Sequence, residues 1–224
     1  MVVPNQTILH IKLNTKSKTM GLKTNTAKAQ YVKLKEGKFY MPDNLEQPYD
    51  ELEGTITNMY FKDDVFNGQP IRKLYVALSD AETVSIVNMS VNSSNFSSFV
   101  NFAKNADLTK PLSLVPVYKM VSKGGEDKPN SSILIEQNGK FIKSYFTKDS
   151  KNGLPEMKQV KISGKLVWDK TDFTEFLENI VTSEFIPVVK GNQDAPVPAR
   201  TPAKAPKKTD IPEDAVDFDD SLPF

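Results

Sequence analysis

Residues 71–105, IRKLYVALSDAETVSIVNMSVNSSNFSSFVNFAKN, contain the two side-chain patterns that decide the fold. Ile71–Leu78 and Thr83–Val91 are rich in apolar and β-branched residues, and a short polar turn separates them. Runs of this length and composition predict two consecutive strands.

The next segment changes to helical spacing. Apolar residues recur at i, i+3, i+4 and i+7, which predicts a helix over residues 95–105. Ser93 or Ser94 is placed to cap its first turn. The apolar stripe of this helix consists of Phe96, Phe99, Val100 and Ala103.

Strand signals continue on both sides of this region. Pro116 marks one of the strands as an edge or a bulge, and Asn138-Gly139 is a strong two-residue hairpin signal. Residues 122–131 are expected to form a flexible loop. The further strand predictions are Leu52–Phe61, Leu112–Val121, Ile133–Gln137 and Lys140–Thr147.

The predicted order is three strands, a helix and two more strands. A helix between the third and fourth strands of a five-stranded Greek-key barrel is the OB-fold order. The prediction is therefore a mainly β protein with an OB-fold domain over residues 30–189, and a generic α+β sheet is the alternative. The additional elements are expected as a hairpin over Gln30–Met41, a strand over Gln159–Trp168 and a last helix that Thr171 or Asp172 caps.

The composition argues against an enzyme. The 224 residues include no cysteine and one histidine, which excludes disulfides, thiolate nucleophiles and the usual cysteine-containing zinc sites. No phosphate-binding glycine motif is present, so we expect no catalytic residue, no cofactor and no metal. The chain has no signal-peptide pattern and no apolar run of about 18 residues. We expect a cytoplasmic protein (in the host-cell cytoplasm if the chain is phage-encoded) without a membrane partner.

The net charge of +1 conceals an uneven distribution. Residues 1–38 contain eight lysines and one glutamate, and residues 39–189 contain 16 basic and 20 acidic residues. Residues 190–209 add five basic residues and one aspartate, whereas residues 210–224 contain six acidic residues and no basic one. This pattern favours a body that binds a polyanion and an acidic end with another role; charged ends that only aid solubility are the alternative.

Aromatic and lysine side chains alternate with apolar ones in several predicted strands. In the second strand Lys73 and Tyr75 lie opposite the apolar face, and in the last strand Phe141, Lys143 and Tyr145 share one face. Exposed rings stack on bases and lysines neutralise phosphates, so this pattern predicts a groove for single-stranded nucleic acid. The candidate contacts are Tyr31, Lys33, Lys73, Tyr75, Tyr118, Lys119, Phe141, Lys143 and Tyr145.

Some of these assignments have alternatives. Lys119 lies on the strand face opposite Tyr118 and is the weakest lysine, and Phe141 and Tyr145 are alternatively cross-strand packing partners. Tyr60, Phe61 and Trp168 are weaker aromatic candidates, and Trp168 is expected to be in the core or half-buried. Residues 1–29 form a lysine-rich arm that either clamps a phosphate backbone or is a solvated terminus.

The C-terminal residues divide into a linker and a tail. Residues 190–209 contain four prolines and almost no large apolar side chain, which predicts a disordered linker. Residues 210–224 are acidic and end in an apolar tip. A terminal ring fills an apolar pocket and a free carboxylate pairs with a basic residue, so this tip suits a partner protein. Its partner-binding candidates are Asp217, Phe218, Asp219, Asp220, Leu222, Pro223 and Phe224.

This DFDDSLPF ending resembles that of the bacterial and phage single-stranded DNA-binding (SSB) proteins. The resemblance covers about fifteen residues. It implies a tail that docks on replication, recombination and repair proteins after a disordered linker. Members of the family differ in subunit number, so a homo-oligomer stays open, and the lack of cysteine argues against the zinc-containing phage variety.

The sequence therefore predicts a non-catalytic protein that coats single-stranded DNA without sequence preference and recruits partners through its tail. An RNA-binding OB protein and a protein-interaction adaptor without nucleic-acid binding are the alternatives.

Overall fold

The computed structural model describes residues 29–42, 44–80, 83–123, 126–162 and 164–192. Residues 1–28 of the predicted arm, residues 193–209 of the predicted linker and the acidic tail lie outside the described residues. The strands are β1 (Ala29–Lys35), β2 (Lys38–Met41), β3 (Asn44–Tyr49), β4 (Leu52–Phe66), β5 (Gln69–Ser79), β6 (Val84–Ser90), β7 (Leu112–Lys123), β8 (Glu126–Gln137), β9 (Lys140–Phe141), β10 (Lys158–Ile162) and β11 (Lys165–Asp169). The helices are α1 (Ser94–Ala103), α2 (Thr171–Ile180) and α3 (Ile186–Asn192), and a π-helical turn (Val181–Phe185) joins the last two. Ala29, predicted in the arm, instead begins β1, and residues 190–192, predicted as linker, end α3.

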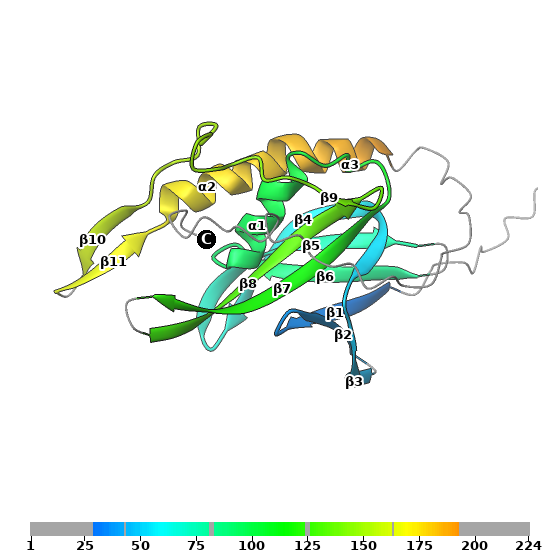
Figure 1. The fold of residues 1–224 in the computed structure, drawn as a ribbon, viewed down its shortest axis with the longest axis horizontal. Coiled ribbons are helices and arrows are strands. Elements are labelled where there is room, and N and C mark those ends of the chain that lie inside the picture. The colour runs from blue at the N-terminus through cyan, green and yellow to red at the C-terminus, as the bar shows by residue number, and fades with distance from the viewer. Residues whose placement is uncertain (1–28, 43, 81–82, 124–125, 163, 193–224) are drawn as a thin grey trace, which may run out of the picture.

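The protein is mainly β, as the sequence predicts. Nine of the described strands form one mixed sheet in the order β3-β2-β1-β6-β5-β4-β7-β8-β9, and β10 and β11 form a separate hairpin. The pairing of β1 with β6 is parallel and the other pairings are antiparallel. Helices α2 and α3 run along one side of the sheet, and the β10–β11 hairpin projects from the end of α2 (Figure 1).

The main core lies between the sheet and the helices. In β5 the alternating Leu74, Val76 and Leu78 are buried in it, whereas Tyr75 and Ala77 belong to a second, smaller cluster on the opposite face. The stripe predicted for α1 is buried in full, and Ser93 is its N-cap, with its Oγ accepting a hydrogen bond from the Phe96 N–H at 3.3 Å. Local alternation and helical spacing are therefore confirmed here.

Helix α1 covers the edge of β8 that faces away from β7. The Ile133 N–H donates to Ser98 Oγ at 2.9 Å, and Ser131 Oγ donates to Asn95 Oδ1 at the same distance. Ser94 Oγ also donates to the carbonyl of Ser131. Because these side chains satisfy this part of the edge, β8 pairs on this side with β9 over Glu136 and Gln137 alone among the described residues. Among the described residues β6 and β8 are not paired, although a closed five-stranded barrel would join them.

The β1–β2 hairpin occupies the free edge of β6 and also reaches β7. The predicted hairpin through Glu36-Gly37 is confirmed, and both turn residues have positive φ angles, 49° and 71°. A Cβ added at Gly37 would lie 2.8 Å from Tyr118 Cβ and 2.9 Å from the Tyr118 backbone nitrogen. The turn thus packs directly on β7, at a distance that only glycine permits.

Three other sequence predictions need correction. Residues 122–131 mostly belong to β7 and β8, which extend as a long antiparallel pair. The predicted strand over Gln159–Trp168 is instead the β10–β11 hairpin, which turns at Gly164 with a φ of 83°. The N-cap of α2 is Lys170, so Thr171 and Asp172 lie in the first turn, where the Thr171 N–H donates to Asp169 Oδ1 at 3.0 Å.

The predicted strand over Lys140–Thr147 is wrong after Phe141. Asn101 of α1, which is buried, accepts hydrogen bonds at its Oδ1 from the N–H groups of Tyr145 at 2.9 Å and Phe146 at 2.6 Å. Its Nδ2 donates to the carbonyl of Phe146 at 3.2 Å. A side chain from a helix therefore replaces the neighbouring strand, and Phe146 turns into the core. No helix of the described residues is long and apolar enough to cross a membrane.

We expect Gly37→Ala to destabilise the protein more than Gly139→Ala. Both glycines have φ angles near 70°, but an added Cβ meets nothing within 4 Å at Gly139. Both variants therefore lose about 1–2 kcal/mol to left-handed strain, and Gly37→Ala loses about 1–3 kcal/mol more to overpacking against β7. Urea unfolding followed by circular dichroism measures both values. Equal losses would contradict the contact between the turn and β7.

Asn101→Ala should lower the free energy of unfolding by about 2–3 kcal/mol, because it leaves buried backbone groups without hydrogen-bond partners. Asn105→Ala is the matched control on the exposed end of the same helical segment, where Nδ2 donates to the Lys143 carbonyl at 3.0 Å. Its loss should stay below about 1 kcal/mol. The same urea titration compares the two, and a similar small loss for both variants would argue against Asn101 as the residue that ends β9.

Candidate nucleic-acid interface

Three tyrosines from three strands meet on the sheet face that points away from the main core. Tyr60 of β4 stacks on Tyr75 of β5, with ring centroids 5.1 Å apart and planes 5° from parallel. Tyr31 of β1 meets Tyr75 edge-on, with centroids 6.4 Å apart. We call these three residues the tyrosine cluster.

The register of the sheet produces this cluster. Tyr60 and Tyr75 are direct cross-strand partners, and the parallel pairing of β1 with β6 places Tyr31 opposite Ile86. Ala77 and Ile86 are buried next to the rings. Exposure is graded, since Tyr75 is 8% exposed and Tyr31 is 52% exposed. The buried ring therefore supports two outer rings, of which Tyr31 is open to a ligand.

The hydroxyl group of Tyr60 stays neutral at physiological pH. Burial raises the pKa of Tyr60 above its usual value of 10.0, and the nearby Tyr31, which is hydrogen-bonded to it, and Tyr75 raise it further. A phenolate at this position would repel a phosphate backbone. The arrangement instead offers uncharged aromatic faces, which stack on bases of any identity.

Lysines flank the tyrosine cluster, and one of them has an acidic partner. Lys33 is exposed on β1, two residues from Tyr31. Lys73 precedes Tyr75 by two residues and forms an ion pair with Asp64 at 2.9 Å. The hydrogen bond from Lys73 lowers the pKa of Asp64, and the same bond raises the pKa of Lys73. Lys62 is the exposed cross-strand partner of Lys73.

The neighbouring Arg72 points to the other side of β5. It donates to Glu178 at 2.7 Å and to Asp63 at 3.0 Å, and its guanidinium lies 5.0 Å from the centroid of the Phe61 ring. The Phe61 ring in turn meets the buried Phe96 edge-on at 6.2 Å. Phe61, which the sequence offered as a weaker candidate for base stacking, therefore packs against the core.

Tyr118 and Lys119 lie on β7. Tyr118 is 40% exposed beside Gly37, and its hydroxyl donates to Met120 Sδ at 3.5 Å. No ring contact joins Tyr118 to the tyrosine cluster among the described residues. Lys119 is part-buried and points to the opposite face of the strand.

The residues predicted on the last strand do not form one face. Phe141 and Tyr145 are part-buried against the main core, and Lys143 is exposed in the segment after β9. The ring of Tyr145 meets Phe146 edge-on at 5.0 Å and lies 5.0 Å from the Lys104 ammonium. The alternative prediction, that Phe141 and Tyr145 are packing partners within the protein, therefore describes these two rings better than base stacking does. Tyr145, however, packs on Phe146 of its own segment rather than across strands.

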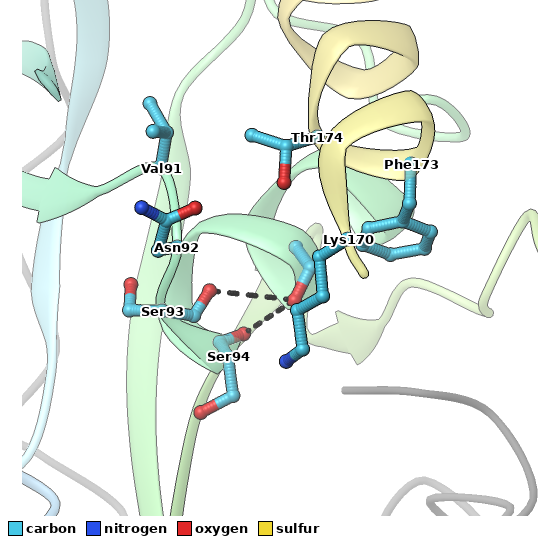
Figure 2. Close-up of a pocket in the computed structure, with 8 residues that line it drawn as sticks. Val91, Asn92, Ser93, Ser94, Lys170, Phe173 and Thr174 are labelled. Atoms are coloured by element: carbon cyan, nitrogen blue, oxygen red, sulfur yellow. Dashed lines mark hydrogen bonds between the residues drawn. The ribbon is translucent and has the colours of Figure 1, made fainter. Parts of the chain in front are cut away.

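Trp168 lies outside the core, contrary to the prediction, and is 53% exposed on β11. Within the described ranges, the β10–β11 hairpin has no third strand to cover it. Its base is fixed where the first turns of α1 and α2 approach each other, with Val91–Ser94 on one side and Lys170, Phe173 and Thr174 on the other (Figure 2). The space between them is about 10 Å³, room for about one water molecule.

From the sequence, Tyr60 is only a weaker aromatic candidate, yet it belongs to the tyrosine cluster. Its position beside Tyr75 depends on the register between β4 and β5, which is shifted by an irregularity between Ile56 and Asn58. The tail candidates 217–224 lie outside the described residues. In the described part of the chain no three His, Asp or Glu side chains are placed to hold a metal ion. No family model, curated protein or solved structure matches this chain.

Asp64→Asn should strengthen binding of a single-stranded oligonucleotide by about 2- to 5-fold, because it releases Lys73 from an exposed ion pair. Asp149→Asn, an exposed change in the segment after Phe146, is the charge-matched control. Fluorescence anisotropy of a labelled oligonucleotide at low salt measures both affinities. If both variants gain equally, net charge rather than Lys73 explains the gain.

Proposed function

We propose that this chain binds single-stranded DNA without sequence preference and performs no catalysis. The tyrosine cluster carries the proposal, because it places an exposed ring, Tyr31, on two supporting rings and beside lysines. Stacked bases gain about 1–3 kcal/mol each on such rings whatever their identity.

The sheet order supports an OB-like architecture as part of this proposal. Strands β6-β5-β4-β7-β8 follow the order of an OB-fold, and α1 lies between its third and fourth strands. In OB-folds the face of the second and third strands binds oligonucleotides. These strands correspond to β5 and β6 here, and Tyr75 of β5 is opposite Asn88 of β6. The tyrosine cluster therefore lies on the face that an OB-fold uses.

The acidic tail supplies the second half of the proposed function. Its DFDDSLPF ending resembles that of SSB proteins, and we assign to it the recruitment of replication, recombination and repair proteins. RNA presents the same bases and phosphates to rings and lysines, so the preference for DNA depends on this resemblance. A matched RNA oligonucleotide must therefore be part of the test.

The test is an anisotropy titration of the full chain with labelled dT30, U30 and a duplex of equal length. We expect saturable binding to dT30 that weakens with salt, weaker binding to U30 and little to the duplex. Tyr31→Ala should weaken dT30 binding by about 5- to 20-fold, whereas Tyr31→Phe, which keeps the ring, should stay within about 2-fold of wild type.

Absence of binding to both single strands at low salt would contradict the proposed function and favour an adaptor that contacts only proteins. Stronger binding to U30 than to dT30 would favour the RNA alternative. Equal effects of Tyr31→Ala and Tyr31→Phe would assign the role of Tyr31 to its hydroxyl rather than to base stacking.

A further inference from the structure

We propose that the β10–β11 hairpin is a second contact for the single strand, with Trp168 as a stacking platform at the end of a path that starts at the tyrosine cluster. This inference rests on the proposed function and extends it to a part of the chain outside the OB-like strands. Three observations carry it: an exposed ring, the local charge and a groove that lies between the end of β6 and the hairpin.

The hairpin exposes an apolar surface that nothing in the described residues covers. Leu166 is 68% exposed and Trp168 is 53% exposed, and both lie on the same face of β11 because they are two residues apart. The cross-strand partners Lys161 and Gln159, both exposed, share this face. A ring, an aliphatic side chain and a cation are thus presented together.

The charge of this segment favours a polyanion over a second apolar surface. Residues 158–170 contain four lysines and one aspartate, although residues 39–189 as a whole have more acidic than basic residues. A patch that docks a protein usually has few lysines at its centre. Rings interleaved with lysines are the composition that single-stranded nucleic acid requires.

Strand β6 leads from the tyrosine cluster toward a groove beside the hairpin. Along the face of β6, Asn88 is opposite Tyr75 and Ser90 is opposite Lys73. Two residues further, Asn92 lines a groove of about 570 Å³ that is bounded on its other side by Val167 and Trp168.

One carboxylate of this groove and one beside it form ion pairs within the protein. Glu178 accepts from Arg72 at 2.7 Å, and Asp172 beside the groove pairs with Lys158 at 3.1 Å. Asp169 accepts from the Thr171 N–H, and this hydrogen bond lowers its pKa. Glu175 is the remaining acidic side chain of the lining. Because its pKa is lowered, Asp169 stays charged beside Trp168, and the lysines of the hairpin have to outweigh its repulsion of a phosphate chain.

Trp168 is the only tryptophan of the chain, so the intrinsic emission of the full-length protein reports this hairpin alone. We expect dT30 to quench this emission with the same midpoint as the anisotropy of labelled dT30. Trp168→Ala should weaken binding by about 5- to 20-fold, and Trp168→Phe should restore most of the affinity because it keeps a ring.

Lys161→Gln should reduce the slope of log affinity against log salt by about 0.7, the value for one phosphate contact on a single strand. Lys140→Gln, an exposed change on β9, is the matched control and should leave the slope unchanged. Circular dichroism and urea unfolding of each variant separate loss of the contact from loss of the fold.

The hairpin contact would be overturned if dT30 binds but does not change the tryptophan emission, and if Trp168→Ala keeps the wild-type affinity and Lys161→Gln the wild-type salt slope. The proposed function would still stand in that case. No binding at all would overturn both. A third outcome is that the emission changes with protein concentration but not with dT30, and that the Trp168→Ala variant has a smaller mass in light scattering. This outcome would identify the hairpin as a contact between copies of the chain and would also overturn the inference.

Discussion

The polar side chains of α1 determine how the sheet is completed. Ser94, Ser98 and Asn101 are directed at backbone groups of β8 and of the segment after β9, and the hydrogen bonds of Ser98 and Asn101 are buried. A buried backbone group without a partner costs about 1–3 kcal/mol, so these residues occupy positions that a neighbouring strand would otherwise fill. Because the helix takes the free edge of β8, the edge of β6 remains open for β1.

The candidate interface is a consequence of that arrangement. Strand β1 joins β6 in parallel, and this pairing brings Tyr31 to the rings of Tyr60 and Tyr75, which β4 and β5 already hold together. Aromatic pairs of this geometry gain about 0.5–1.5 kcal/mol beyond the area that they bury. The inner ring is therefore rigid, and the outer one is available. A closed barrel with β8 at this edge would leave no position for Tyr31.

Sequence patterns predicted the features that depend on near neighbours in the chain. The alternation in β5, the apolar stripe and cap of α1 and the β1–β2 hairpin follow from spacing and turn residues, and all are present. The predictions that were wrong or missed involve residues whose partners are far away in the sequence. Asn101 binds the backbone of Tyr145, 44 residues later in the chain, and so ends the predicted strand. The register of β4 places Asp64 beside Lys73. No local sequence pattern predicts either contact.

The charge of the described region makes ring stacking the central part of the proposed mechanism. Residues 29–192 contain 20 basic and 21 acidic residues, so the net charge of the folded part does not attract a polyanion. Attraction has to come from the placement of cations such as Lys33 and Lys161 beside exposed rings, and from the five lysines of residues 1–28. Such a surface gains much of its affinity from stacking, which salt screens little, and the smaller remainder from released counterions. The near-neutral body and the aromatic surface therefore both support the proposal that a single strand binds through its bases.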